Sequence, residues 1–170
     1  MSEPELPSID LSVEQWLELV RRGANIPVTI PVKGTSMLPL IRYMIDPATV
    51  APLRREPMEG DIVLFRRFGD GVMVIHRVYR VLGDQVQTWG DNCRKPDKPV
   101  SREDVLGLVV SIRRNGQIVP LDTEEQRRRG VRWMRSPFRR RLWIAWNRTC
   151  WFAGNLIRRV FPNFHFHKRS

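Results

Sequence analysis

The sequence predicts a mainly β domain, with a small helix before it and a basic, Trp-rich helical tail after it. Short β-branched or alternating runs, separated by Gly, Pro and Asp, fill residues 27–112. One run with helical spacing precedes them, and arginine clusters interleaved with tryptophan follow them. A chain of 170 residues suits one domain of ordinary size with an appendage.

The first predicted element is a helix over residues 11–23. Its apolar residues recur at helical spacing, Ser12 and Gln15 resemble a capping box, and Gly23 ends it. The apolar positions are Val13, Trp16, Leu17 and Val20. We expect residues 1–25 to form a helical unit that packs on the core.

Residues 26–122 form the predicted β domain of five to seven strands. Turn residues separate the apolar runs, and "RNGQ" is typical of a hairpin turn before "IVPL". The other expected strands are "PVTIPV", "DIVLFRR", "VMVIHRVYRV", "DQVQTW" and "VLGLVVSIRR". The chain contains no internal repeat.

The charge is concentrated in the third predicted segment, residues 123–170. Residues 1–126 hold 16 Lys/Arg and 18 acidic residues, whereas residues 127–170 hold 13 Lys/Arg and no acid. The near-neutral body therefore gives no reason to expect nucleic acid as its partner. The tail is where we expect an acidic partner.

Within this tail, residues 142–157 form the most apolar stretch. As a helix, it would place Leu142, Trp146, Cys150 and Ile157 on one stripe and Arg158 largely away from it. Its 16 residues fall short of the roughly 20 that a spanning helix needs. We expect residues 127–170 to bind an anionic membrane surface; the alternative is that the stripe packs back on the β domain.

The N-terminus and the cysteines bear on localisation and cofactors. "MSEPELPSIDL" has acids and prolines where a signal peptide has a basic region and an apolar run. The expected localisation is therefore at the membrane, peripheral from the cytoplasmic side. Cys93 and Cys150 lie far apart and without metal-ligand spacing, so the sequence predicts no metal or other cofactor.

Candidate catalytic residues lie in three stretches of the β domain. Ser36 stands in "GTSMLPLI", His76 is the only histidine of the body, and Asp91 and Asp97 bracket "DNCRKPD". Serine, histidine and aspartate supply a nucleophile, a base that titrates near neutral pH, and a carboxylate that fixes the imidazole tautomer. Each also has a simpler interpretation: a core histidine for His76, an Asx turn for Asp91 and a surface position for Asp97.

Four boxes in this order resemble the clan of serine peptidases that includes signal peptidases and SOS repressors. They cover roughly residues 27–113 and are "GTSMLPLI", "EGDIVLF", "VIHRVYRV" and "GDNCRKPD", followed by "VLGLVVSI". Bacterial members use a lysine as base, whereas the endoplasmic-reticulum and archaeal signal peptidases have a histidine there. The chain is most similar to the second kind, because His76 occupies the base position.

The resemblance implies roles for individual residues. Ser36 would be the nucleophile, His76 the general base, and Asp97 or Asp91 the group that orients it. The backbone N–H groups of Ser36 and Thr35 would hold the oxyanion. Gly34 stands where many signal peptidases have a serine, so no side-chain donor is expected there.

The resemblance also implies a β fold in which a peptide adds as an extended strand, with shallow pockets for small side chains before the cleaved bond. Met37 and Pro39 would contact that peptide. Signal peptidases normally carry an N-terminal membrane helix, which this sequence does not lead us to expect here. Either the tail inserts deeply or the substrate is cytoplasmic.

The sequence thus predicts a serine endopeptidase of the signal peptidase type, which cleaves a peptide or protein substrate through an acyl-enzyme. The alternative is a non-catalytic β module that binds a peptide, or a polyanion through its basic tail. Self-cleavage, as in SOS repressors, is a narrower option, although no helix-turn-helix accompanies it.

Overall fold

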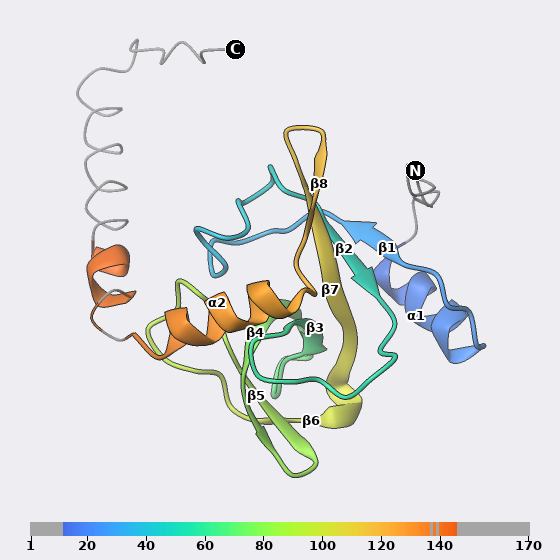
Figure 1. Cartoon of the computed structure of the whole chain (residues 1–170). Coiled ribbons are helices and arrows are strands. Elements are labelled where there is room, and N and C mark those ends of the chain that lie inside the picture. Colours follow the sequence, from blue (N-terminus) through green and yellow to red (C-terminus); the bar gives the residue numbers. More distant parts are fainter. Residues whose placement is uncertain (1–11, 137, 139, 146–170) are drawn as a thin grey trace.

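A computed structural model describes residues 12–136, 138 and 140–145 (Figure 1). It begins with helix α1, Val13–Arg21, and the predicted capping box is confirmed: the Ser12 side chain accepts from the Gln15 amide and Gln15 reaches back to Ser12. Trp16 is fully buried and donates its indole N–H to the Ile26 carbonyl at 2.7 Å. This bond and the buried apolar side attach α1 to the sheet.

The strands form one antiparallel sheet, so the predicted mainly β class is confirmed; the sheet curls into a half-barrel. The order is β1-β2-β7-β3-β4-β5-β6, and β8 pairs with β7 as the expected hairpin. The bounds are β1 Val28–Ile30, β2 Ala48–Ala51, β3 Ile62–Arg66, β4 Met73–Leu82, β5 Gln85–Trp89, β6 Val100–Ser101, β7 Val105–Arg114 and β8 Gln117–Pro120, with a 3₁₀ turn at Arg102–Asp104.

Two of these strands, β2 and β6, were not among the predicted ones. β2 has four residues and a bulge between Thr49 and Val50, and β6 has only two residues. Such short runs show too little alternation to stand out from loop sequence. Both are defined by their partners, β2 between β1 and β7 and β6 beside β5.

Two apolar clusters form the core. One lies between α1 and the sheet, and the second is smaller and contains Val63, Phe65, Val78, Val86, Val100 and Val105. Burying each such side chain contributes about 1.5–3 kcal/mol. Strand β4, which carries the candidate base, contributes Ile75 to the first cluster and Val78 to the second, so the core holds it on both faces.

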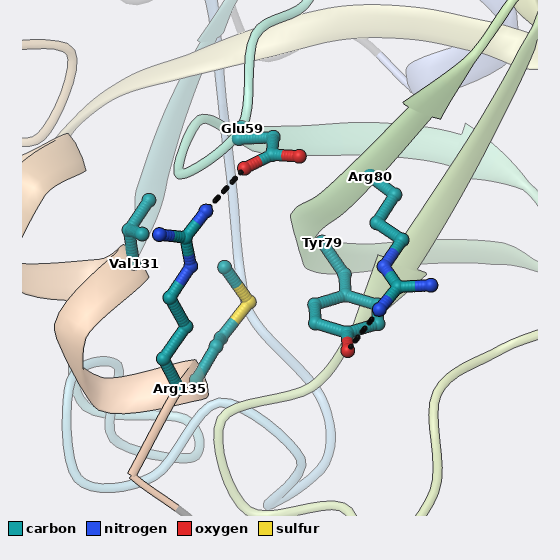
Figure 2. A pocket seen from close by; sticks show the side chains of 6 residues that line it. Glu59, Tyr79, Arg80, Val131 and Arg135 are labelled. Atoms are coloured by element: carbon teal, nitrogen blue, oxygen red, sulfur yellow. Dashed lines mark hydrogen bonds and ion pairs between the residues drawn. The ribbon is translucent and has the colours of Figure 1, made fainter.

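Helix α2, Glu124–Met134, begins the predicted tail and lies beside β4 (Figure 1). Gly130 permits this approach, because a Cβ there would meet the Arg77 guanidinium. Figure 2 shows the ion pair between Arg135 and Glu59, 3.3 Å, at a small pocket between α2 and β4. Trp133 also donates its indole N–H to the Asp91 carbonyl at 3.1 Å, so α2 is attached to the loop that carries both candidate aspartates.

Most of the predicted amphipathic helix at 142–157 lies outside the described residues. Within the described part, residues 140–145 continue the helical tail, and no helix there is long and apolar enough to cross a membrane.

Candidate active site

His76 lies in the middle of β4, opposite Val63 of β3. Successive strand residues point to opposite faces, so His76 and Arg77 face different sides of the sheet. The histidine is 5% exposed, and its ring centroid is 6.0 Å from that of Phe65. A polar side chain at this depth requires hydrogen-bond partners.

Asp97 supplies one partner. Its Oδ2 is 2.7 Å from His76 Nδ1, and the Thr88 hydroxyl donates to the same oxygen at 2.7 Å. The Asp97 amide bonds the Thr88 carbonyl, and Gln87 Nε2 donates to the Asp97 carbonyl. Residues of β5 thus fix both the backbone and the carboxylate of Asp97.

The pKa values of the pair reflect this contact. Burial lowers the pKa of His76, but hydrogen bonds with Asp97 and with Cys93 outweigh it and raise the pKa to about 9. Burial tends to raise the pKa of Asp97, but the bond with His76 leaves it below its ordinary value. With the carboxylate ionised, Nδ1 carries the donated proton and Nε2 is directed away from Asp97.

Ser36 lies on the turn between β1 and β2. The Asn92 amide donates to the Ser36 carbonyl at 2.7 Å, and Asn92 Nδ2 donates to the Thr35 carbonyl at 3.0 Å. Within the described residues, the amides of Thr35 and Ser36 have no hydrogen-bond acceptor. Two N–H groups therefore remain available for an anion beside the candidate nucleophile.

Gly90 is the point where these parts meet. A Cβ on this residue would lie 2.9 Å from His76 Nε2, 2.9 Å from the Ser36 carbonyl and 2.7 Å from Cys93 Sγ. The absence of a side chain lets the imidazole, the serine turn and the thiol come together. The glycine of "WGDN" is therefore a packing requirement of the site.

The side of the imidazole away from Asp97 faces Cys93. The Cys93 thiol helps to raise the pKa of His76, whereas the Ser36 hydroxyl has no hydrogen bond among the described residues. Ser36 is half-buried. The arrangement is a His–Asp pair whose second nitrogen meets the Ser36 turn and the Cys93 thiol at Gly90.

Asp91 has a different partner from Asp97. It accepts two bonds from Arg77, Nε to Oδ1 at 3.0 Å and Nη2 to Oδ2 at 2.9 Å. Arg77 Nη1 donates to the Gly60 carbonyl at 2.8 Å, and both side chains are buried. Asp91 is thus engaged by arginine, and the structure places only Asp97 against His76.

Of the two residues expected to contact a peptide, Met37 is 2% exposed and packs in the main core, where it anchors the Ser36 turn. Pro39 is exposed and follows a cis peptide bond. Only Pro39 of this pair presents surface.

Four residues at the site were not among the predicted site residues: Thr88, Asn92, Cys93 and Arg140. The burial of Thr88 could have been predicted, because strand alternation puts it on the same buried face of β5 as Val86. The other three act through turns or through a distant segment: Arg140 Nη2 reaches the Gly90 carbonyl at 3.2 Å and the Cys93 carbonyl at 2.6 Å. No local pattern predicts such contacts.

No protein-family model matches this chain, and neither does any curated protein. The described residues contain no group of three or more His, Cys, Asp or Glu side chains that could hold a metal ion. Any functional assignment therefore depends on the geometry above and on the motifs that carry the resemblance.

Proposed function

We propose that this protein is a serine endopeptidase of the signal peptidase type, with Ser36 as nucleophile, His76 as general base and Asp97 as the group that orients it. The observation that carries the proposal is the 2.7 Å contact of His76 Nδ1 with Asp97, with Nε2 and the Ser36 turn converging on Gly90. Three sequence-distant segments supply the three groups that acyl transfer needs.

In the proposed reaction, His76 Nε2 accepts the proton of the Ser36 hydroxyl as Oγ attacks the peptide carbonyl. Asp97 stabilises the imidazolium, and the free amides of Ser36 and Thr35 donate to the oxyanion. The imidazolium returns its proton to the leaving amine, and water then hydrolyses the acyl-enzyme. Before the first of these steps, the Ser36 hydroxyl must take the place of the Cys93 thiol beside the imidazole.

The pKa of His76 sets the pH range. A histidine with a pKa of about 9 is mostly protonated at neutral pH and cannot accept a proton. Activity should therefore rise with pH until it levels off above about pH 9. A bound peptide that displaces the thiol would also remove one of the two bonds that raise this pKa.

The resemblance extends the proposal to the substrate and the membrane. The peptide would bind as an extended strand near the Ser36 turn, with small side chains before the cleaved bond. We propose that residues 127–170 bring the enzyme to an anionic membrane surface from the cytoplasmic side. The 13 basic residues of this segment support that part of the proposal.

A second function is favoured by one observation: the Ser36 hydroxyl makes no hydrogen bond with a described residue, and the Cys93 thiol is the nucleophilic group that helps to raise the pKa of His76. A β module that binds a peptide without cleaving it would tolerate such an arrangement. Under this alternative, Ser36→Ala leaves peptide binding intact and no serine is activated.

A fluorophosphonate probe, with mass spectrometry of the labelled peptide, tests the proposal on the full chain bound to anionic vesicles. We expect labelling at Ser36 in the wild type and none in Ser36→Ala or His76→Ala. Ser101→Ala is the matched control, because Ser101 makes no side-chain cap bond and lies away from the site. Absence of labelling in folded wild-type protein above pH 9 would contradict the proposal.

A further inference from the structure

A cavity of about 460 Å³ has Cys93 in its lining. It is lined by β5, by the turn after it and by the helical residues 140–145; the lining residues are Trp89, Cys93, Arg94, Lys95, Arg140, Arg141, Ile144 and Ala145. Four of them are basic and none is acidic. The indole and Ile144 add apolar surface between the charges.

Arg140 is the buried cation of this cavity. It is 3% exposed, and its guanidinium carbon lies 3.7 Å from the centroid of the Trp89 ring. Nη2 donates to two backbone carbonyls, but Nη1 is buried without a hydrogen-bond partner, and the described residues give Arg140 no ion pair. A buried guanidinium with an unused donor is costly unless an anion meets it.

The remaining cations surround it. Arg94, Lys95 and Arg141 are exposed, and none forms an ion pair with a described residue. The other buried arginine of the described residues differs: Arg77 is neutralised by Asp91. The cavity therefore concentrates positive charge that the described chain does not balance.

The position of the cavity relative to Ser36 restricts what enters it. Cys93 belongs to the cavity lining, and its thiol and His76 Nε2 both lie beside Gly90. An extended peptide advances about 3.3 Å per residue, so a chain whose scissile bond lies at Ser36 brings residues one to three positions away to Cys93. A side chain at such a position reaches the Arg140 region.

We propose that this cavity is a subsite for an acidic side chain of the substrate peptide, one to three residues from the cleaved bond. Arg140 and the exposed Arg94 and Arg141 donate to its carboxylate, and Trp89 contacts its methylene groups. Charge-assisted bonds from arginine are the strong ones, which gives the subsite its selectivity for Glu or Asp over the neutral amides. This inference rests on the proposed function for the location of the scissile bond.

Binding to the full-length Ser36→Ala protein tests the subsite without requiring catalysis. The probes are acetylated, amidated alanine–serine decapeptides, each with one glutamate at a successive position, and matched peptides with glutamine. Tryptophan fluorescence or calorimetry gives the dissociation constants. We expect the best glutamate peptide to bind about tenfold more tightly than its glutamine partner.

Charge reversal then locates the effect. Arg94→Glu and Arg141→Glu change exposed side chains, so the fold is retained, and each should bring the glutamate-to-glutamine ratio close to one. Arg132→Glu is the matched control: an exposed arginine of α2 outside this cavity, with the same change in charge, which should keep the tenfold ratio. Arg140→Gln should also abolish the ratio, provided circular dichroism shows a folded protein.

The proposal is overturned if no glutamate peptide binds more tightly than its glutamine partner, including the case in which neither binds. It is also overturned if Arg132→Glu lowers the ratio as much as Arg94→Glu does. Phosphatidylglycerol vesicles form a separate arm: binding that Arg94→Glu and Arg141→Glu abolish, without any peptide preference, would assign the cavity to lipid. A peptide preference without probe labelling at Ser36 would retain the subsite and reject the peptidase.

Discussion

Two neighbouring side chains of β4 form two ion pairs of different character. His76 bonds Asp97 and Arg77 bonds Asp91, and both aspartates come from the same short loop after β5. Strand alternation sends the pairs to opposite faces. The Arg77 pair lies under α2, while the His76 pair lies beside the Ser36 turn.

The difference lies in what each pair can do. Arginine stays protonated, so its buried bidentate contact with Asp91 is a fixed link between β4, the loop and Gly60. His76 can lose its proton as the pH rises through about 9, and its second nitrogen lies at Gly90 beside the Ser36 turn and the Cys93 thiol. One loop thus provides stability through its first aspartate and, in the proposal, chemistry through its second.

Removing the Asp91 carboxylate should have the largest effect on stability. Asp91→Asn leaves Arg77 buried without a counter-charge, which is expected to cost about 3–5 kcal/mol of unfolding free energy. Urea unfolding of the wild type and of Asp91→Asn measures this loss of unfolding free energy. Asp70→Asn is the control, because the pair of Arg67 with Asp70 is exposed and its loss should change stability far less. Equal losses in the two variants would contradict the structural role of Asp91.

The His76 pair should make stability depend on pH. The pKa of His76 is raised from 6.5 to about 9, so its contribution is complete below about pH 6.5 and is lost as the pH rises through 9. At about 1.4 kcal/mol per pKa unit, the difference amounts to about 3 kcal/mol. The comparison is urea unfolding of the wild type and His76→Gln across this range. Parallel curves for the two proteins would contradict the raised pKa.

Two glycine substitutions test the His76–Asp97 and Arg77–Asp91 pairs separately, because each adds a methyl group beside only one of them. Gly90→Ala puts a methyl group between His76 Nε2 and the Ser36 carbonyl, and a displacement of about 1 Å there should lower the probe-labelling rate about a hundredfold. Gly130→Ala presses on the Arg77 guanidinium instead and should lower stability while the labelling rate per folded molecule persists. Unchanged labelling in Gly90→Ala would show that Ser36 and His76 do not act together.

The smallest effect is expected at Cys93. Cys93→Ala removes one of the two bonds that raise the pKa of His76, so the midpoint of the pH–labelling curve should move to lower pH by roughly one unit. More labelling at neutral pH is the expected consequence. A midpoint that stays in place would mean that the thiol does not influence the base.

The longer strands were predictable because their apolar and β-branched residues alternate or run together, as in β4 and β7. His76, Ser36 and the two aspartates were found from residue type and motif order. The choice between Asp91 and Asp97 could not be made from the sequence, because it depends on which face of β4 each loop residue meets. β2, the Cys93 contact and the reach of Arg140 to Gly90 arise from tertiary packing, which local sequence does not encode.

The most direct test of the comparison is the rate at which a fluorophosphonate labels Ser36 in Asp97→Asn and in Asp91→Asn, measured above pH 9 and per folded molecule. Asp97→Asn should lower the rate about a thousandfold, because the amide no longer holds the imidazole in the required tautomer. Asp91→Asn should keep the wild-type rate. A wild-type rate in folded Asp97→Asn, or an equal loss in both variants, would contradict the assignment of the two aspartates to chemistry and to stability.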